Sequence, residues 1–175
     1  MLQNAEDAFA RRKGWEGARA ISFHLTMTEV RVSHFGEPFD EADVRGICGI
    51  AMSTKDLTTI GHFGIGFKSV YAFTDGPEVH SGGEAFAIES FVWPVAIPAI
   101  ELYVEETVFI LPLHVGDAGA HAEIADGLRR IGPRTLLFLR QIKEIAWSVE
   151  NGPSGLYLRG NPEELGENAR RIVLL

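Results

Sequence analysis

The segment best suited to bind a phosphate group reads Gly-His-Phe-Gly-Ile-Gly-Phe-Lys-Ser and covers residues 61–69. Its three glycines allow the backbone to approach a ligand closely. The residues that follow favour a helix, whose free N–H groups and dipole attract an anion, and Lys68 adds a positive charge in the first turn. The segment lacks the Gly-Lys-Ser/Thr ending of a Walker loop, and no βαβ unit surrounds it. A purely structural turn is the alternative interpretation.

A second candidate lies in the opening segment, where Asn4 and Asp7 are three residues apart and share one face of an expected helix. The side-chain oxygen of an asparagine is a hard ligand that suits Mg²⁺, which takes few protein ligands and keeps several waters. Arg11 follows Asp7 by one turn and could pair with it. An ordinary solvated helix face is the alternative interpretation.

Two loops hold candidates for contacts with a flat ligand and with phosphates. After a predicted strand, His34 and Phe39 flank Gly36, which would permit close approach to the ligand. Ser53 and Lys55 lie in a small, polar segment that could close over phosphates. A structural strand-end histidine and an exposed loop are the corresponding alternatives.

The sequence contains few other residues whose type and spacing indicate a binding or catalytic site. Thr107 brings one hydroxyl to the start of an apolar strand, where it could bind a base edge, a water or the backbone. The histidines are scattered and Cys48 is the single cysteine, so neither a metal cluster nor an internal disulfide is expected. No Ser-His-Asp arrangement stands out from the spacing.

The elements that must position these residues change in character along the chain. A helix is expected over the opening residues, then a hairpin of half-buried strands over 20–25 and 29–33, with short helices after Asp40 and Gly66. Later residues favour strands over 85–92, 100–104, 107–113, 144–149, 155–159 and 170–175, with one helix over 124–131. Early helices and late strands without βαβ alternation predict an α+β fold, a two-layer α/β sandwich with a mixed, mostly antiparallel sheet.

Composition narrows the class of protein. The 175 residues carry a formal net charge of −8 and are 46% hydrophobic, which suits a soluble domain with a real core. An acidic chain has no broad electrostatic reason to coat nucleic acid or an anionic membrane. No apolar run approaches roughly 20 residues, so no membrane span is expected. A cytoplasmic setting is the simplest expectation, and both ends indicate an excerpt of a longer chain.

Taken in order, these segments resemble the ATP-binding domains of the gyrase, heat-shock chaperone, histidine kinase and MutL (GHKL) family, and within it a sacsin-like branch. Leu-Gln-Asn-Ala-Glu-Asp-Ala is similar to the N-box helix of that family, and His-Phe-Gly-Glu-Pro-Phe followed by Ala-Met-Ser-Thr-Lys resembles its base loop and lid. Residues 60–75 resemble its second glycine box, residues 106–113 a late strand that faces the nucleotide, and residues 135–145 the segment that follows.

The resemblance implies a Bergerat-type ATP-binding fold and a Mg²⁺-ATP ligand. Asn4 would ligate the Mg²⁺, and His34 would stand where the family usually has an aspartate that accepts from the adenine amino group. A neutral imidazole can accept that hydrogen bond, whereas a protonated one cannot. Thr107 would reach the adenine, with a water between them. The remaining pocket residues are Asp7, Ala8 and Arg11 beside Asn4, and Gly36 and Phe39 around the base.

The resemblance also assigns the phosphate end of the site. Ser53 and Lys55 would belong to the lid. The phosphates would lie in the cradle formed by Gly61, Phe63, Gly64, Ile65, Gly66, Phe67 and Lys68.

Two departures from the family pattern matter. The base loop reads His-Phe-Gly where the branch commonly has His-Asn-Gly, so Phe35 offers no polar group to a base. The glutamate that polarises the attacking water in the family precedes the N-box asparagine by four residues, which is a position before Met1. No catalytic residue is therefore expected in the chain. Hydrolysis should be slow, because a positioned base contributes about 10²–10⁴-fold.

These expectations combine into one function with two alternatives. The chain is expected to be a Mg-ATP-binding domain of a chaperone-like or regulatory conformational ATPase, over residues 1–133, followed over residues 134–175 by the beginning of a β-rich segment. Its expected partners are the nucleotide, further domains of a longer chain and an unidentified client protein, with no direct binding to nucleic acid. The alternatives are a degenerate nucleotide-binding or interaction module without turnover, and a histidine-kinase catalytic domain, for which no phosphoacceptor helix is present.

Overall fold

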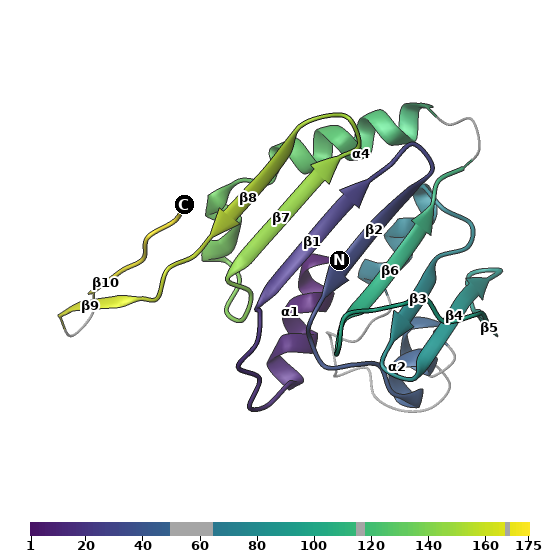
Figure 1. Ribbon diagram of the computed structural model, residues 1–175, viewed down its shortest axis with the longest axis horizontal. Coiled ribbons are helices and arrows are strands. Elements are labelled where there is room, and N and C mark those ends of the chain that lie inside the picture. Colours follow the sequence, from purple (N-terminus) through teal and green to yellow (C-terminus); the bar gives the residue numbers. More distant parts are fainter. Residues whose placement is uncertain (50–64, 115–117, 167–168) are drawn as a thin grey trace.

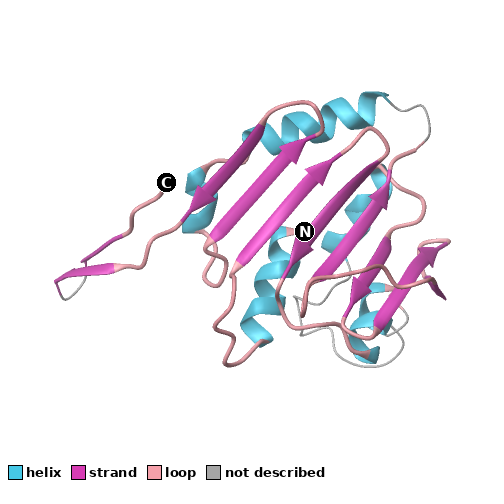
Figure 2. Cartoon of the chain, in the orientation of Figure 1, coloured by secondary structure: helices cyan, strands magenta, loops and turns pink. Residues whose placement is uncertain are grey.

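A computed structural model describes residues 1–49, 65–114, 118–166 and 169–175. One large sheet forms one layer, and helices that cover one of its faces form the other (Figures 1 and 2). The helices are α1 (Leu2–Arg11), α2 (Glu41–Ile47), α3 (Ile65–Lys68) and α4 (Ala118–Arg130), with 3₁₀ turns η1 (Ser69–Ala72) and η2 (Pro133–Leu137). The predicted α+β two-layer sandwich is confirmed.

The large sheet is mixed and mostly antiparallel, as the sequence predicts. Its strands are β1 (Ala20–Leu25), β2 (Glu29–His34), β3 (Glu78–Ser81), β4 (Glu84–Glu89), β5 (Trp93–Ala96), β6 (Thr107–Pro112), β7 (Glu144–Val149) and β8 (Ser154–Leu158). Their spatial order is β5-β4-β3-β6-β2-β1-β7-β8, and β1 and β7 form the parallel pair. Strand β6 therefore lies between β2 and β3 and brings together residues that are far apart in the sequence.

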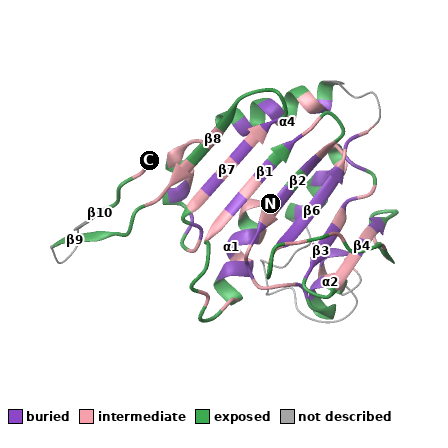
Figure 3. Ribbon diagram, in the orientation of Figure 1, coloured by how far each residue is buried: buried purple, intermediate pink, exposed green. Residues whose placement is uncertain are grey.

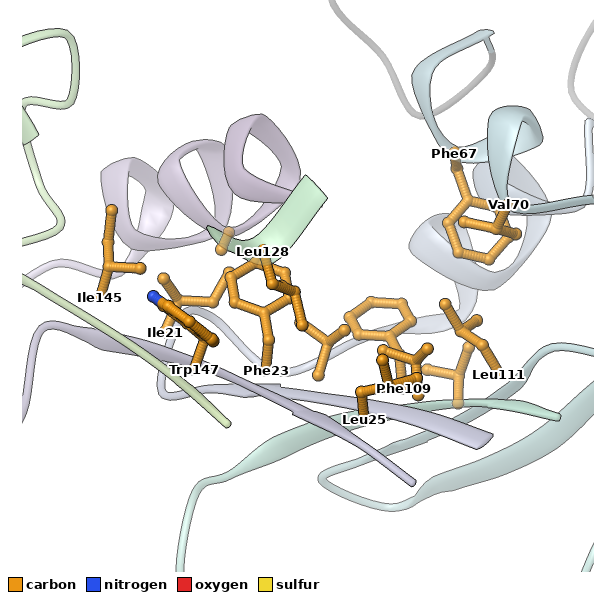
Figure 4. Close-up of a cluster of buried hydrophobic side chains, with 14 of the residues drawn as sticks. Ile21, Phe23, Leu25, Phe67, Val70, Phe109, Leu111, Leu128, Ile145 and Trp147 are labelled. Atoms are coloured by element: carbon orange, nitrogen blue, oxygen red, sulfur yellow. The ribbon is translucent and has the colours of Figure 1, made fainter. Parts of the chain in front are cut away.

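The core lies between the sheet and the helices. Along β1, Ile21, Phe23 and Leu25 are buried while the residues between them are more exposed, which is the period-2 pattern of a strand with one covered face (Figure 3). Leu128 of α4 packs into the same cluster, and Phe67 extends from α3 towards the sheet (Figure 4).

The expected strand over residues 100–104 is wrong. Residues 97–106 contain no strand and cross the helix-free face of the sheet on the way from β5 to β6 (Figure 1), and we call them the strap. The amide of Ile97 donates to Ala85, and Glu106 closes a turn onto Tyr103. Two of the apolar side chains that predicted a strand, Ile100 and Leu102, instead line a hollow over the sheet together with Val108.

The sheet continues past the boundary predicted at residue 134, because β7 pairs with β1 and β8 extends the same edge. A separate ribbon of β9 (Glu163–Gly166) and β10 (Ala169–Arg171) projects from the body (Figure 1). The division into two segments stays a prediction. Within the described part of the chain, no helix is long and apolar enough to cross a bilayer.

Candidate functional site

Helix α1 carries the first group of predicted site residues. Ala5, Ala8 and Phe9 are buried against the sheet, so the opposite side of the helix faces outward. Asp7 accepts a hydrogen bond from Gln3 at 2.8 Å. Arg11 bonds both carboxylate oxygens of Asp43, at 2.8 and 3.1 Å, and so ties α1 to α2. Asp43 also closes the capping box of α2 with Asp40, which fixes the carboxylate that Arg11 meets.

Asn4 has an unusual environment on this helix. The Nδ2 atom of its side-chain amide is buried, and no hydrogen-bond partner lies within reach among the described residues. A buried donor without a partner costs about 1–3 kcal/mol. Such a group is more readily explained at a binding site than in a purely structural helix.

Glu6 anchors α1, and sequence reasoning missed it. Its buried carboxylate accepts from the backbone N–H groups of Arg140 at 2.5 Å, Gln141 at 2.7 Å and Ile142 at 3.0 Å. Glu6 stands one turn after Leu2 and three residues before Phe9, so helical periodicity places it on the apolar face. That position is a signal that could have identified it. Since both carboxylate oxygens bind backbone N–H groups, Glu6 does not serve as a substitute general base.

The base loop connects β2 to α2 and begins at His34. His34 is opposite Thr107 in the register of β2 and β6, and Thr107 is opposite Ser81 of β3. The hydroxyls of Ser81 and Thr107 lie 2.5 Å apart, and the Ser81 hydroxyl accepts from the amide of Phe39 at 3.0 Å. Sheet order therefore gathers four polar groups, three from strands and one from the base loop, into one buried cluster.

His34 is neutral at physiological pH. Burial, with a smaller effect from the positive charge of Arg12, lowers the pKa of His34 from its usual 6.5 to about 4. Its Nδ1 accepts a hydrogen bond from the amide of Gly36 at 3.0 Å. In a neutral ring the other nitrogen then carries the proton. The imidazole offers a donor at Nε2, which differs from the acceptor role that the family resemblance implies for this position.

Gly36 closes the base loop onto α1. The amide of Glu37 donates to the carbonyl of Ala8 at 3.0 Å. A Cβ atom built on Gly36 would lie only 2.5 Å from the Ala8 Cβ. The absence of a side chain at Gly36 therefore allows the loop to contact the helix at Ala8.

The Gly36→Ala substitution should destabilise the fold by about 1–3 kcal/mol, because the new methyl group has no room beside Ala8. Adding Ala8→Gly should recover part of this loss, although glycine within a helix costs about 1 kcal/mol. Urea denaturation of the single and double variants measures the coupling. Gly127→Ala is the control, since open space surrounds Gly127 on α4. If the two substitutions changed the free energy of unfolding in a strictly additive way, the proposed contact between positions 36 and 8 would be rejected.

An aromatic cluster lies beneath the base loop. Phe109 is central, with ring centroids 5.9 Å from Phe39, 6.0 Å from Phe67 and 6.0 Å from His34. Phe39 and Phe67 are both buried. Their packing is structural in this conformation, and it supports the polar cluster from below.

The phosphate end is described only in part. Ile65 begins α3, Gly66 and Lys68 are exposed, and the Lys68 ammonium would lie 3.3 Å from a Cβ atom placed on Gly49. Helix α3 has four residues and continues as the 3₁₀ turn η1, so its dipole is weaker than the expected helix would provide. The other predicted residues of this end lie outside the described residues: Ser53, Lys55, Gly61, Phe63 and Gly64.

Two hollows are lined by described residues, and neither lining includes a residue of the polar cluster. One of about 580 Å³ lies between Trp15, Arg19, Lys143 and Arg159. The other, of about 430 Å³, lies between the strap and the helix-free face near Ser33. No group of three or more His, Cys, Asp or Glu side chains is gathered for a metal ion within the described ranges.

Known proteins resemble this chain both in sequence and in fold. Residues 32–90 match the family described as "Sacsin domain". The chain is 31% identical over 131 residues to "Protein NO VEIN" of Arabidopsis thaliana, which covers 68% of this chain and 5% of that protein. It is 44% identical over 54 residues to "Sacsin" of Homo sapiens, covering 30% of this chain and 1% of that protein.

A solved structure described as the N-terminal domain of a DNA repair protein shares the fold. The TM-score is 0.52 at 15% sequence identity, covering 89% of this chain and 48% of that chain. This likeness concerns the fold alone. The chain spans a small fraction of its curated relatives, and the segment over 32–90 includes the base loop and the glycine box. The chain is thus related to sacsin-like proteins and combines that relation with an α+β two-layer fold.

Proposed function

We propose that the chain binds Mg-ATP as part of a longer chaperone-like or regulatory conformational ATPase. The observation that carries the proposal is the buried Nδ2 atom of Asn4, which has no hydrogen-bond partner among the described residues and lies on a helix that packs directly against the base loop. The sacsin-like relation supports the assignment, because the segments that resemble the GHKL site include Asn4, the base loop and Thr107 in the same order.

The residues at this position fit a magnesium ion. Mg²⁺ is usually bound through one or two protein oxygens together with phosphate oxygens and waters. The Asn4 amide oxygen would supply the protein ligand, while its Nδ2 would find an acceptor in a phosphate oxygen. When bound, the ion neutralises charge on the phosphates. Lys68, exposed at the end of α3, would add a second positive charge at the phosphate end.

The base contact in this proposal differs from the family's aspartate contact. His34 donates through Nε2 to a ring nitrogen of the base, since its Nδ1 is engaged by Gly36. The hydroxyls of Thr107 and Ser81 are hydrogen-bonded to each other. Either hydroxyl can rotate, so the pair could donate a hydrogen bond to the ligand or accept one from it. In this class of protein, ATP acts as a ligand that favours one conformation over another.

Calorimetric titration with a non-hydrolysable ATP analogue, in Mg²⁺ and then in EDTA, tests the proposal. We expect binding that weakens without Mg²⁺, and a further loss of about tenfold or more in Asn4→Ala. Asn4→Asp retains an oxygen ligand and should keep the Mg²⁺ dependence. Gln3→Ala, on the exposed side of the same helix, is the matched control and should bind as the wild type does. Binding that ignores both EDTA and the loss of Asn4 would reject the assignment.

A degenerate interaction module is the second candidate. It is favoured by the way in which Ser81, Thr107 and the Phe39 amide satisfy one another within the polar cluster. A folded sample that binds no nucleotide would make this second function the better one.

A further inference from the structure

Arg12 is the C-cap residue of α1 and makes the most extensive set of polar contacts beside the base loop. Its Nη1 donates to the carbonyl of Phe35 at 2.6 Å and to that of Gly36 at 3.1 Å. Its Nη2 forms an ion pair with the Glu105 carboxylate. The guanidinium carbon lies 3.8 Å from the centroid of the Trp15 ring, and the Arg12 side chain is only 9% exposed. One side chain therefore joins the helix, the base loop and the end of the strap.

The contact with Phe35 reaches His34 through a single peptide group. The carbonyl of Phe35 and the amide of Gly36 belong to the same planar unit. Arg12 holds the carbonyl end of that unit, and the amide end donates to Nδ1 of His34 at 3.0 Å. Fixing the plane from one end fixes the direction of the N–H at the other, and hence the tautomer and orientation of the imidazole.

Phe35 contributes to the same arrangement. Its ring stacks on Trp15 with an angle of 14° between the planes and 6.4 Å between the centroids. Trp15 thus contacts both the guanidinium and Phe35. The aromatic residue at position 35, where the sacsin-like branch commonly has asparagine, anchors the loop by stacking and leaves the polar contact with the base to His34.

The strap supplies the opposing charge. Glu105 has a positive φ of 68°, a conformation that is unfavourable for a residue with a side chain. The ion pair with Arg12 offsets that cost and holds the strap end immediately before Thr107. Of the two predicted base-contact positions, His34 therefore directly precedes a residue that Arg12 binds, and Thr107 follows another by two residues.

We propose that Arg12 is a positioning residue for the base: through the Phe35–Gly36 peptide it sets the imidazole of His34 in the donor orientation, and so controls affinity for the base rather than for the phosphates. The role in base affinity rests on the proposed function, whereas the positioning of His34 does not. Lysine cannot replace arginine here, because a single ammonium lacks the planar fork that binds two carbonyls and a carboxylate while it lies over an aromatic ring.

The test has one readout without nucleotide and one with it. Nitrogen NMR of the His34 ring should report a single tautomer, protonated at Nε2, in the wild type and in the control Arg45→Ala, whose parent side chain is 63% exposed on α2. In Arg12→Gln we expect a mixture of tautomers and a higher His34 pKa, since the nearby positive charge is lost. Arg12→Lys retains the charge and should show the tautomer mixture with a smaller pKa change. Unchanged His34 signals in folded Arg12→Gln would overturn the inference.

The nucleotide readout compares a non-hydrolysable ATP analogue with inorganic tripolyphosphate. We expect both Arg12 variants to lose about tenfold in affinity for the nucleotide and little for tripolyphosphate. Equal losses for the two ligands would contradict a role in base recognition. If the wild type binds neither ligand, the proposed function fails, and the NMR result alone decides whether Arg12 positions His34.

Discussion

The Glu6→Ala variant should lose about 3–5 kcal/mol in free energy of unfolding, the largest effect that we expect from a single polar substitution in this chain. The Glu6 carboxylate is buried and accepts three hydrogen bonds from the backbone N–H groups of residues 140–142. Hydrogen bonds to charged groups contribute about 1.5–3 kcal/mol each, and removing the acceptor leaves the donors without partners. The loss should also loosen α1, because these bonds hold that helix to the segment before β7.

The Glu6→Gln variant separates the effect of the negative charge on stability from the effect of side-chain shape. Glutamine keeps one acceptor oxygen but places an NH₂ group against an N–H donor, so it should also be destabilising, by less than alanine. Glu123→Gln makes the same chemical change on the exposed surface of α4 and serves as the control. Urea midpoints at constant m-value give the difference in stability. Stability of Glu6→Ala within about 0.5 kcal/mol of the wild type would refute this anchoring role.

The layers of the fold could be predicted from the sequence because the strands have one covered face. In β1 the apolar residues alternate with polar ones, and the hairpin with β2 follows from that pattern. The alternation of Ile100, Leu102 and Val104 predicts a strand, but Ile100 and Leu102 line a hollow over the sheet and Val104 is exposed. Alternation of apolar residues alone does not determine which backbone segments pair.

The candidate site was predictable only in part for a different reason. His34 and Thr107 are neighbours because β6 enters between β2 and β3, a matter of topology that no local pattern contains. The family resemblance predicts that both residues contact the base. It does not predict the hydrogen bond from the Gly36 amide to Nδ1 of His34, which leaves Nε2 as the donor. Arg12 was missed because an arginine at a helix end is ordinarily solvated, and its three partners come from positions far along the chain.

Acid should destabilise the protein through His34, and this is the second large effect. The pKa of His34 is lowered from 6.5 to about 4, chiefly because the ring is buried with only 3% of its surface exposed. The unfolded chain takes up a proton below about pH 6.5, whereas the folded protein resists it until about pH 4. Stability is therefore full above pH 6.5 and falls as the pH decreases towards 4. A difference of about 2.5 pKa units corresponds to a loss of about 3 kcal/mol.

The His34→Asn variant isolates this contribution. Asparagine can accept from the Gly36 amide but does not titrate, so its stability should change by about 3 kcal/mol less than that of the wild type between pH 7 and pH 4. Urea denaturation at pH 7, 5.5 and 4 measures both slopes, and carboxylates shared by the two proteins cancel in the difference. His24→Asn makes the same chemical change at an exposed histidine bonded to Ser148 and serves as the matched control. Identical slopes for His34→Asn and the wild type would mean that the buried imidazole is not the acid-sensitive group. A flatter slope would instead establish that His34 is held in its neutral form in the folded state before any ligand binds.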